Sequence, residues 1–258
     1  FTGEIGEFVA KEHFKLTLAS KVERAVDGTD PYGYKYQVKS KVMTNKGSLR
    51  VTKLDIYEVD YLCAVFFDTL YNPIRIIRLQ QEFFPGPNFS INNKFLKGKE
   101  YNEYLGYDIN LNPVTQKELN VFGELFIKLK ESGIVHSRRI VGDIGEYYAC
   151  DEMGLIRNSN NTEKGFDAKD SQGNTYEIKT RRVYESGRRK SNTRRLNNLV
   201  DKTANFLIVV VLDRSFSCDG MWKMPLSNVV NPKSANLSIV KNTLETETII
   251  STSIDWLK

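Results

Sequence analysis

Two short apolar runs, each bounded by charged residues, dominate the hydropathy pattern of the chain. The first is YLCAVFFD at positions 61–68, and the second is FLIVVVLD at positions 206–213. Both are rich in β-branched and aromatic side chains, which is typical of strands that are buried on both faces. Neither approaches the roughly 18 apolar residues that a membrane helix needs. The pattern therefore predicts one buried central strand in each half of the chain and no membrane association.

A helical pattern precedes the second half. In TQKELNVFGELFIKLKESG, positions 115–133, the apolar residues keep helical spacing, Thr115 and Glu118 form a capping-box pattern, and Gly133 is placed to end the helix. We expect this helix to introduce the second half, and its counterpart in the first half to lie upstream of Phe1. The segment 81–114 is rich in Asn and Gly and is expected to be an irregular connector.

The chain contains one pattern twice. GEIGEFVAKEHFKL (3–16) aligns without gaps with GDIGEYYACDEMGL (142–155), and six of the fourteen positions are identical. The segment 28–41 then corresponds to 165–182, and the two apolar runs correspond to each other. Matched blocks in one order indicate a tandem duplication. Each copy predicts a helix, two strands joined by a tight turn, a basic segment and the buried strand.

This order of elements predicts an α/β fold in which helices flank a mixed sheet. We expect three parts: a first repeat at 1–80, the connector at 81–114 and a second repeat at 115–258.

Composition narrows the classes of function. The three cysteines are scattered and form no C-x-x-C pair, which favours a reducing, cytoplasmic setting. Only two histidines, His13 and His136, are present, so histidine-rich metal clusters and HNH-type nuclease chemistry are excluded and a Ser-His-Asp triad is disfavoured.

The net charge of +5 is unevenly distributed along the chain, with basic residues gathered in two segments. RRVYESGRRKSNTRR, positions 181–195, carries seven basic residues and one acid, and KSKVMTNKGSLRVTK, positions 39–53, carries five basic residues and no acid. Such segments can bind DNA phosphates, and arginine can also read guanine edges. The alternative is a solvated loop. The candidate DNA-binding residues are Arg181, Arg182, Arg188, Arg189, Lys190, Arg194 and Arg195 in the second copy, and Lys41, Lys46 and Arg50 in the first.

An acid and a lysine lie two positions apart on the strand before the longer basic segment. Glu177 and Lys179 project from the same face, because side chains alternate along a strand. Asp167, across the predicted turn, and Glu146, on the predicted helix, complete a set of three acids and one lysine. Converging carboxylates can hold Mg²⁺ and leave positions for water and a phosphate oxygen. Lys179 is then placed to orient or deprotonate the attacking water.

Taken singly, each of these residues has a simpler interpretation. The helix acids could be solvent-exposed, the aspartates could form turns, and the strand lysines could prevent edge-to-edge association. The recurrence of the set in both copies, in the same order, favours a functional site.

The ordered set of a helix Glu, G-F-D, E-I-K and an apolar strand resembles the PD-(D/E)xK nuclease superfamily, which has a restriction-endonuclease-like fold. The resemblance implies that Asp167 and Glu177 bind metal, that Lys179 is catalytic and that Glu146 is an additional acidic ligand. The proline that usually precedes the Asp is replaced by Phe166.

The first copy offers Glu7, Asp30, Gln37 and Lys39, with Asp30 as the expected metal ligand. Gln37 keeps an oxygen ligand but removes one negative charge. Asp30 and Gln37 are 7 positions apart, against 10 for the second copy, so the turns are expected to differ or to contain a bulge.

The expected function is Mg²⁺-dependent endonuclease activity on double-stranded DNA, with Mn²⁺ as a possible substitute and one site per repeat, in a restriction or defence nuclease. The chain would act as a monomer with two pseudo-equivalent halves, or as a homodimer. Two alternatives are a DNA-binding module with one or both sites inactive, and a structure-specific or RNA nuclease.

Overall fold

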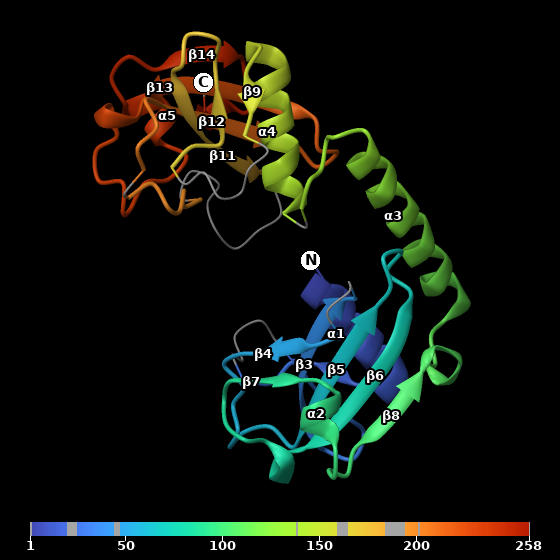
Figure 1. Ribbon diagram of the computed structural model, residues 1–258. Helices are drawn as coiled ribbons and strands as arrows, with labels where there is room; N and C mark the ends of the chain where they lie inside the picture. Colours follow the sequence, from blue (N-terminus) through green and yellow to red (C-terminus); the bar gives the residue numbers. More distant parts are fainter. Residues whose placement is uncertain are drawn as a thin grey trace. The chain divides into compact units, whose positions relative to one another are not determined.

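The chain folds into two compact units, 1–128 and 129–258. The computed structural model describes residues 2–19, 25–43, 47–137, 139–158, 165–183, 194–200 and 202–257. Each unit combines helices with a mixed six-stranded sheet (Figure 1). The predicted α/β architecture with mixed sheets is confirmed.

Unit 1 carries its helix first. Its elements are α1 (Thr2–Phe14), β1 (Thr17–Leu18), β2 (Gly28–Thr29), β3 (Lys35–Val42), β4 (Leu49–Val51), β5 (Tyr61–Phe67), β6 (Pro73–Gln80), the short helix η1 (Gln81–Phe83), β7 (Phe89–Ile91), α2 (Asn93–Leu96), β8 (Asn102–Leu105), η2 (Gly106–Asp108) and α3 (Pro113–Glu131). The main sheet has the order β1-β2-β3-β5-β6-β8, and β4 pairs with β7 in a separate ribbon. The boundary between the units falls within α3.

Unit 2 repeats this plan. Its elements are α4 (Ile140–Met153), β9 (Ile156–Arg157), β10 (Ala168–Lys169), β11 (Thr175–Arg182), β12 (Phe206–Leu212), β13 (Cys218–Pro225), η4 (Leu226–Asn228), α5 (Ile239–Asn242), β14 (Glu247–Ile250) and η5 (Asp255–Leu257). The sheet order β9-β10-β11-β12-β13 matches β1-β2-β3-β5-β6 of unit 1. In both units the third and fourth strands of this series are parallel, and the other neighbours are antiparallel.

The two apolar runs form the parallel partners β5 and β12. Every residue from Leu62 to Phe67 is at most 2% exposed, and every residue from Leu207 to Leu212 is 0% exposed. The prediction of one buried central strand per half is confirmed. Burial on both faces explains why these strands read as continuous apolar runs rather than alternating ones.

A glycine brings the helix of each unit close to the long strand. A Cβ atom on Gly145 of α4 would lie 1.9 Å from Oγ1 of Thr180 in β11, and one on Gly6 of α1 would lie 2.4 Å from Cβ of Ser40 in β3. Real Cβ atoms do not approach this closely, so only glycine permits the observed packing. Since Glu146 and Glu7 follow these glycines directly, the close approach fixes where each helix acid stands against its sheet.

All of the expected connector, 81–114, belongs to unit 1. β8 pairs with β6 at the edge of the main sheet, and β7 pairs with β4. Its aromatic residues explain this difference, because Phe89, Phe95 and Tyr101 pack against the core of the unit. The helix expected from Thr115 begins two residues earlier, at Pro113, and the side chain of Asn112 accepts the amide hydrogen of Val114. Within the described ranges, no helix has the length and apolar character needed to cross a membrane.

Candidate active site

A cleft of about 1230 Å³ in unit 2 brings the predicted residues together. Glu146 of α4, Asp167 before β10, and Glu177, Lys179 and Arg181 of β11 all line it. These residues come from three segments that are up to 35 positions apart in the sequence. The strand pairing and the close approach of the helix are therefore what assemble the set.

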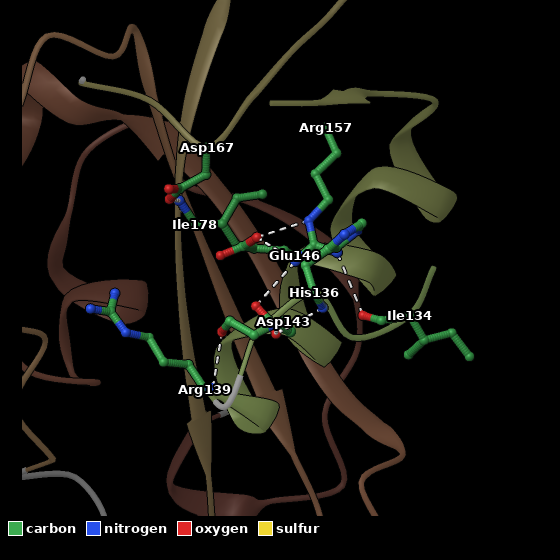
Figure 2. A network of polar contacts seen from close by, with 9 residues as sticks. Ile134, His136, Arg139, Asp143, Glu146, Arg157, Asp167 and Ile178 are labelled. Carbon is green, nitrogen blue, oxygen red and sulfur yellow. Dashed lines mark hydrogen bonds and ion pairs between the residues drawn. The ribbon is translucent and has the colours of Figure 1, made fainter. Parts of the chain in front are cut away.

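Asp167 is fixed by the backbone of β11. Its Oδ2 accepts a hydrogen bond from the amide of Ile178 at 2.8 Å, and its own amide donates to the carbonyl of Tyr176 at 2.7 Å. Figure 2 shows the carboxylate of Asp167 facing the strand at Ile178. Because Ile178 stands between Glu177 and Lys179, this bond places the aspartate beside both.

Glu177 is a fully buried carboxylate held between two lysines. Its side chain is 0% exposed, and it forms ion pairs with Lys179 through Oε1 and with Lys202 through Oε2, the latter at 2.8 Å. Oε2 nevertheless has no partner with hydrogen-bond geometry. A buried carboxylate needs opposite charge nearby, and the two ammonium groups supply it. Lys202 was not predicted, since nothing in its spacing 25 positions after Glu177 indicates the contact.

Glu146 belongs to an ion-pair network with Arg157 of β9 and Asp143. Nε and Nη2 of Arg157 donate to Oε2 of Glu146 at 2.9 and 2.7 Å, and Nη2 lies 3.3 Å from Oδ1 of Asp143 (Figure 2). Oδ2 of Asp143 accepts the amide hydrogens of His136 and Ser137 at 3.0 and 2.5 Å. The network ties the start of α4 to β9 and to the segment before the helix.

Burial raises the pKa of Glu146 above its usual value. Arg157 opposes this shift, and the negative charges of Asp167 and Asp143 reinforce it. The carboxyl group of Glu146 therefore binds a proton more readily than a solvent-exposed glutamate does. Arg157 and Asp143 were not predicted, although the alternating acids of GDIGE could have drawn attention to Asp143.

The two arginines at the end of β11, and Arg194 beyond it, bind backbone carbonyl groups in the structure. Arg181 donates to the carbonyl of Arg195, and Arg182 donates to the carbonyls of Asp213 and Arg214. Arg194 donates to the carbonyl of Arg182. Each guanidinium has five N–H donors and keeps its full charge when it binds a neutral carbonyl. The arginines thus stabilise this end of the sheet as well as making it positive.

The other candidate DNA-binding residues are scattered. Arg195 donates to the carbonyl of Lys233, Lys41 donates to the carbonyl of Ser48, and Arg50 is exposed on β4. Arg188, Arg189, Lys190 and Lys46 lie outside the described residues. DNA contact by these residues stays a prediction.

In unit 1 the counterpart of Asp167 is Asp27 and not Asp30. Oδ2 of Asp27 accepts the amide hydrogen of Val38 at 2.6 Å, which is the same bond that Asp167 makes. Asp27 and Gln37 are 10 positions apart, as are Asp167 and Glu177, so no bulge is needed to match the two units.

Asp30 closes the turn instead. Its Oδ1 accepts the amide hydrogens of Tyr32 and Tyr34, as Asp170 does for Gln172 and Asn174 in unit 2. The sequence match of GTD (28–30) with GFD (165–167) pairs Asp30 with Asp167. The strand register instead aligns Gly28 with Ala168, which pairs Asp27 with Asp167. Aspartate is common in both roles, so composition alone could not separate them.

Unit 1 keeps the geometry of the site with less charge. Gln37 is 5% exposed, and its Oε1, like Oε2 of Glu177, has no hydrogen-bond partner. Burial raises the pKa of Asp27, while the bond from Val38 and the nearby Lys39 oppose the rise. Glu7 is half-buried on α1.

The strand registers also locate the unit 1 positions that match the cations of unit 2. Leu18 pairs with Gly28 as Arg157 pairs with Ala168, so Leu18 stands in the place of Arg157. Oδ2 of Asp60 accepts the amide hydrogen of Lys35 as Oδ1 of Asn205 accepts that of Thr175. Counting back three residues from each acceptor places Tyr57, which is 86% exposed, opposite Lys202 in this alignment.

The donors in the cleft suit a hard divalent cation. Asp167 and Glu177 offer carboxylate oxygens, which Mg²⁺ prefers, and Oε2 of Glu177 is buried without an aligned hydrogen bond. No group of three or more His, Cys, Asp or Glu side chains that could hold a metal ion occurs in the described part of the chain.

Comparison with protein-family models and with curated proteins gave no match to this chain. The interpretation of the cleft therefore rests on its residues and on their geometry.

Proposed function

We propose that the chain is a Mg²⁺-dependent DNA endonuclease built from two restriction-endonuclease-like units, with its principal site in the cleft of unit 2. The observation that carries the proposal is the position of Asp167. Its carboxylate is bonded to the backbone between Glu177 and Lys179, and all three residues line one cleft. This arrangement suits metal-assisted hydrolysis of a phosphodiester, with oxygen ligands on one side and an ammonium group beside them.

Each residue has a role in the proposed reaction. Asp167 and Glu177 would hold the cation, which when bound neutralises charge on the phosphate and makes water more acidic. Lys179, as an ammonium group, would orient the attacking water and stabilise the hydroxide that forms when this water loses a proton to solvent. Glu146 would act as the additional acid, with both Arg157 bonds on its Oε2. Arg181, at the edge of the cleft, would attract the phosphate backbone.

The same chemistry in unit 1 would use Asp27, Gln37 and Lys39. Gln37 provides a neutral oxygen, so cation binding there would be weaker than in unit 2. We propose a restriction or other defence nuclease as the biological setting, by analogy with proteins that share this site pattern.

The experiment uses supercoiled plasmid and mixed-sequence phage DNA with Mg²⁺. The wild type is compared with Lys39→Ala, Lys179→Ala and the double variant. Linear products from the wild type and only nicked circles from each single variant would support two working sites, one for each strand. Nicking that only Lys179→Ala abolishes would make unit 1 a recognition or scaffold half.

The two units supply a matched exchange for the same assay. Glu177→Gln gives unit 2 the residue of unit 1, and Gln37→Glu does the reverse. We expect Glu177→Gln to raise the Mg²⁺ concentration needed for cleavage and Gln37→Glu to lower it for the unit 1 site. Unchanged Mg²⁺ dependence in both variants would contradict the assignment of these positions as cation ligands.

A DNA-binding module without catalysis is the second candidate. The ion pairs of Glu177 with Lys179 and Lys202 favour it, because they neutralise the carboxylate without a metal ion. If the wild type shifts duplex DNA in a gel but leaves every substrate intact in Mg²⁺ or Mn²⁺, this candidate replaces the endonuclease.

A further inference from the structure

Among the described residues, Lys202 is the cation that pairs with Glu177 from outside the E-x-K pattern. It comes from the segment before β12, and its Nζ lies 2.8 Å from Oε2 of Glu177, while Lys179 binds Oε1. The side chains of Lys179 and Lys202 are 16% and 24% exposed, and that of Glu177 is 0% exposed. Both lysines line the cleft in which Asp167 lies.

Two ammonium groups are more than one carboxylate requires. A single buried charge is neutralised by one opposite charge, so Glu177 by itself needs only one of the two lysines, and Asp167 supplies the other carboxylate in this part of the cleft. A divalent cation bound to Glu177 would stand about 2.1 Å from a carboxylate oxygen, which is close to the space that Lys202 Nζ holds at Oε2. The cation and the ammonium group would then repel each other strongly at a distance of a few ångströms.

Unit 1 provides an internal comparison. The strand registers match Gln37 to Glu177 and Lys39 to Lys179, and counting back along the chain from β5 and β12 matches Tyr57 to Lys202. The lysine of the Q-x-K or E-x-K pattern is thus present in both units, as Lys39 and Lys179. The additional lysine, Lys202, occurs only in unit 2, where the matched position also holds the acid Glu177.

We propose that Lys202 is a positioning residue that competes with the divalent cation for Oε2 of Glu177 and so sets the cation affinity of the cleft. The inference rests on the proposed function, because it takes Glu177 as a ligand of that cation. Before the cation binds, Lys202 holds the buried carboxylate in place. When the cation takes Oε2, the ammonium group of Lys202 leaves it and remains in the cleft.

The test measures cation binding without nucleic acid. Titration calorimetry with Mg²⁺, and separately with Mn²⁺, compares the full-length wild type with Lys202→Met and Glu177→Gln. Methionine keeps most of the length of the lysine stem and removes its charge. Lys169→Met is the matched control, since it removes one positive charge from an exposed position of the same unit.

We expect Lys202→Met to bind the cation on the order of tenfold more tightly than the wild type, which corresponds to about 1.4 kcal/mol. Lys169→Met should bind as the wild type does, and Glu177→Gln should bind more weakly. The cation should also stabilise the folded protein against urea, which tryptophan fluorescence measures. The cation affinity derived from this stabilisation should be higher in Lys202→Met than in the wild type by the same factor. This readout also shows that the variant is folded.

Equal or weaker cation binding by Lys202→Met, with Glu177→Gln impaired, would overturn the role of Lys202 and leave the proposed function standing. Absence of cation binding in both the wild type and Lys202→Met would overturn it as well. Tighter binding by Lys202→Met in a chain that cleaves no DNA would support the role of Lys202 and contradict only the endonuclease.

Discussion

Replacement of Arg157 by methionine should destabilise unit 2 through the carboxylates that it leaves behind. The guanidinium of Arg157 lies between Asp143 and Glu146, and the three side chains are 15%, 8% and 25% exposed. Methionine preserves most of the packing volume of the arginine stem. The change therefore removes charge and hydrogen bonds from a site where two acids remain.

The expected magnitude follows from the bonds that are lost. Glu146 accepts two hydrogen bonds from Arg157, at 2.9 and 2.7 Å, and Asp143 accepts a longer one at 3.3 Å. Removing one partner of a buried ion pair costs about 3–5 kcal/mol. Because Glu146 is a quarter exposed and Asp143 retains two backbone amide donors, we expect the low end, about 3 kcal/mol at neutral pH.

The loss should depend on pH with a defined sign. Burial already raises the pKa of Glu146, and Arg157 is the group that opposes the rise. In the variant the pKa of folded Glu146 is higher still, so the folded state binds a proton more tightly than the unfolded state. An acid whose pKa is raised in the folded state destabilises the fold as the pH rises from the unfolded-state pKa through the folded-state pKa. The difference between variant and wild type should thus be larger at pH 7.5 than at pH 5.

Both tryptophans of the chain lie in unit 2, which makes the assay specific. Trp222 is 3% exposed, and Trp256 packs against the same core, so their fluorescence reports the unfolding of this unit alone. With a urea slope of about 2 kcal/mol/M, the midpoint should fall by about 1.5 M. The control is Lys223→Met, which breaks the ion pair of Lys223 with the mostly exposed Glu247 and should cost under about 1 kcal/mol.

An Arg157→Met midpoint within 0.3 M of the wild type at pH 7.5 (about 0.6 kcal/mol) would refute the reasoning, and so would a larger loss at pH 5 than at pH 7.5. The first result would mean that solvent satisfies both acids. The second would mean that the lost charge does not control the titration of Glu146.

Three further predictions concern the scaffold and unit 1. Gly145→Ala should cost about 1–3 kcal/mol in the same urea assay, because its Cβ would lie 1.9 Å from Oγ1 of Thr180. Gly142→Ala on the same helix is the control and should not destabilise the fold, because the nearest atom to its Cβ would be 3.9 Å away. Equal effects of the two substitutions would contradict the close packing of the helix against β11. In a Lys179→Ala background, Asp27→Ala should abolish any remaining DNA nicking and Asp30→Ala should leave it, and the opposite result would restore the original alignment. Cys63 is 0% exposed, and burial raises the pKa of its thiol, so it should react with a disulfide reagent only when unit 1 unfolds. Labelling of Cys63, identified by peptide mass spectrometry, should begin at the same urea concentration in the wild type and in Arg157→Met. Rapid labelling in the native state would refute its burial.

The sequence predicted the strands of the site but not the aspartate of unit 1. Continuous apolar runs and the spacing of E-x-K and Q-x-K fixed β5, β12 and the face of each long strand, since these features repeat with strand geometry. Asp27 and Asp30 lie three residues apart, and both precede a strand in a polar segment. Only the register, in which the amide of Val38 bonds Asp27, distinguishes a site residue from a turn residue.

The cations around the acids could not be predicted for a different reason. Arg157 and Lys202 are 11 and 25 positions from Glu146 and Glu177, and each cation lies on a different element from its acid, so no repeat within one helix or strand indicates the contact. Their contacts depend on the order of strands in the sheet. For the arginines at the end of β11 and in the segment after it, DNA contact stays a prediction, and the sequence did not indicate that Arg181 and Arg194 also bind backbone carbonyl groups.

The differences between the two units lie in charge, within a backbone arrangement that is shared. The glycine at the helix and the aspartate bonded to the strand amide recur at Gly6 and Asp27 as at Gly145 and Asp167. What unit 1 lacks is a matched pair, the acid at position 37 together with a lysine at position 57. Adding the acid alone would bury a negative charge with Lys39 as the counterpart of Lys179 and no lysine at the position that matches Lys202. Gln37→Glu should therefore bind a divalent cation more readily than the cleft of unit 2 does, and should depend on that cation for its stability. If it instead folds equally well with and without Mg²⁺, the second lysine of unit 2 is dispensable for holding its glutamate.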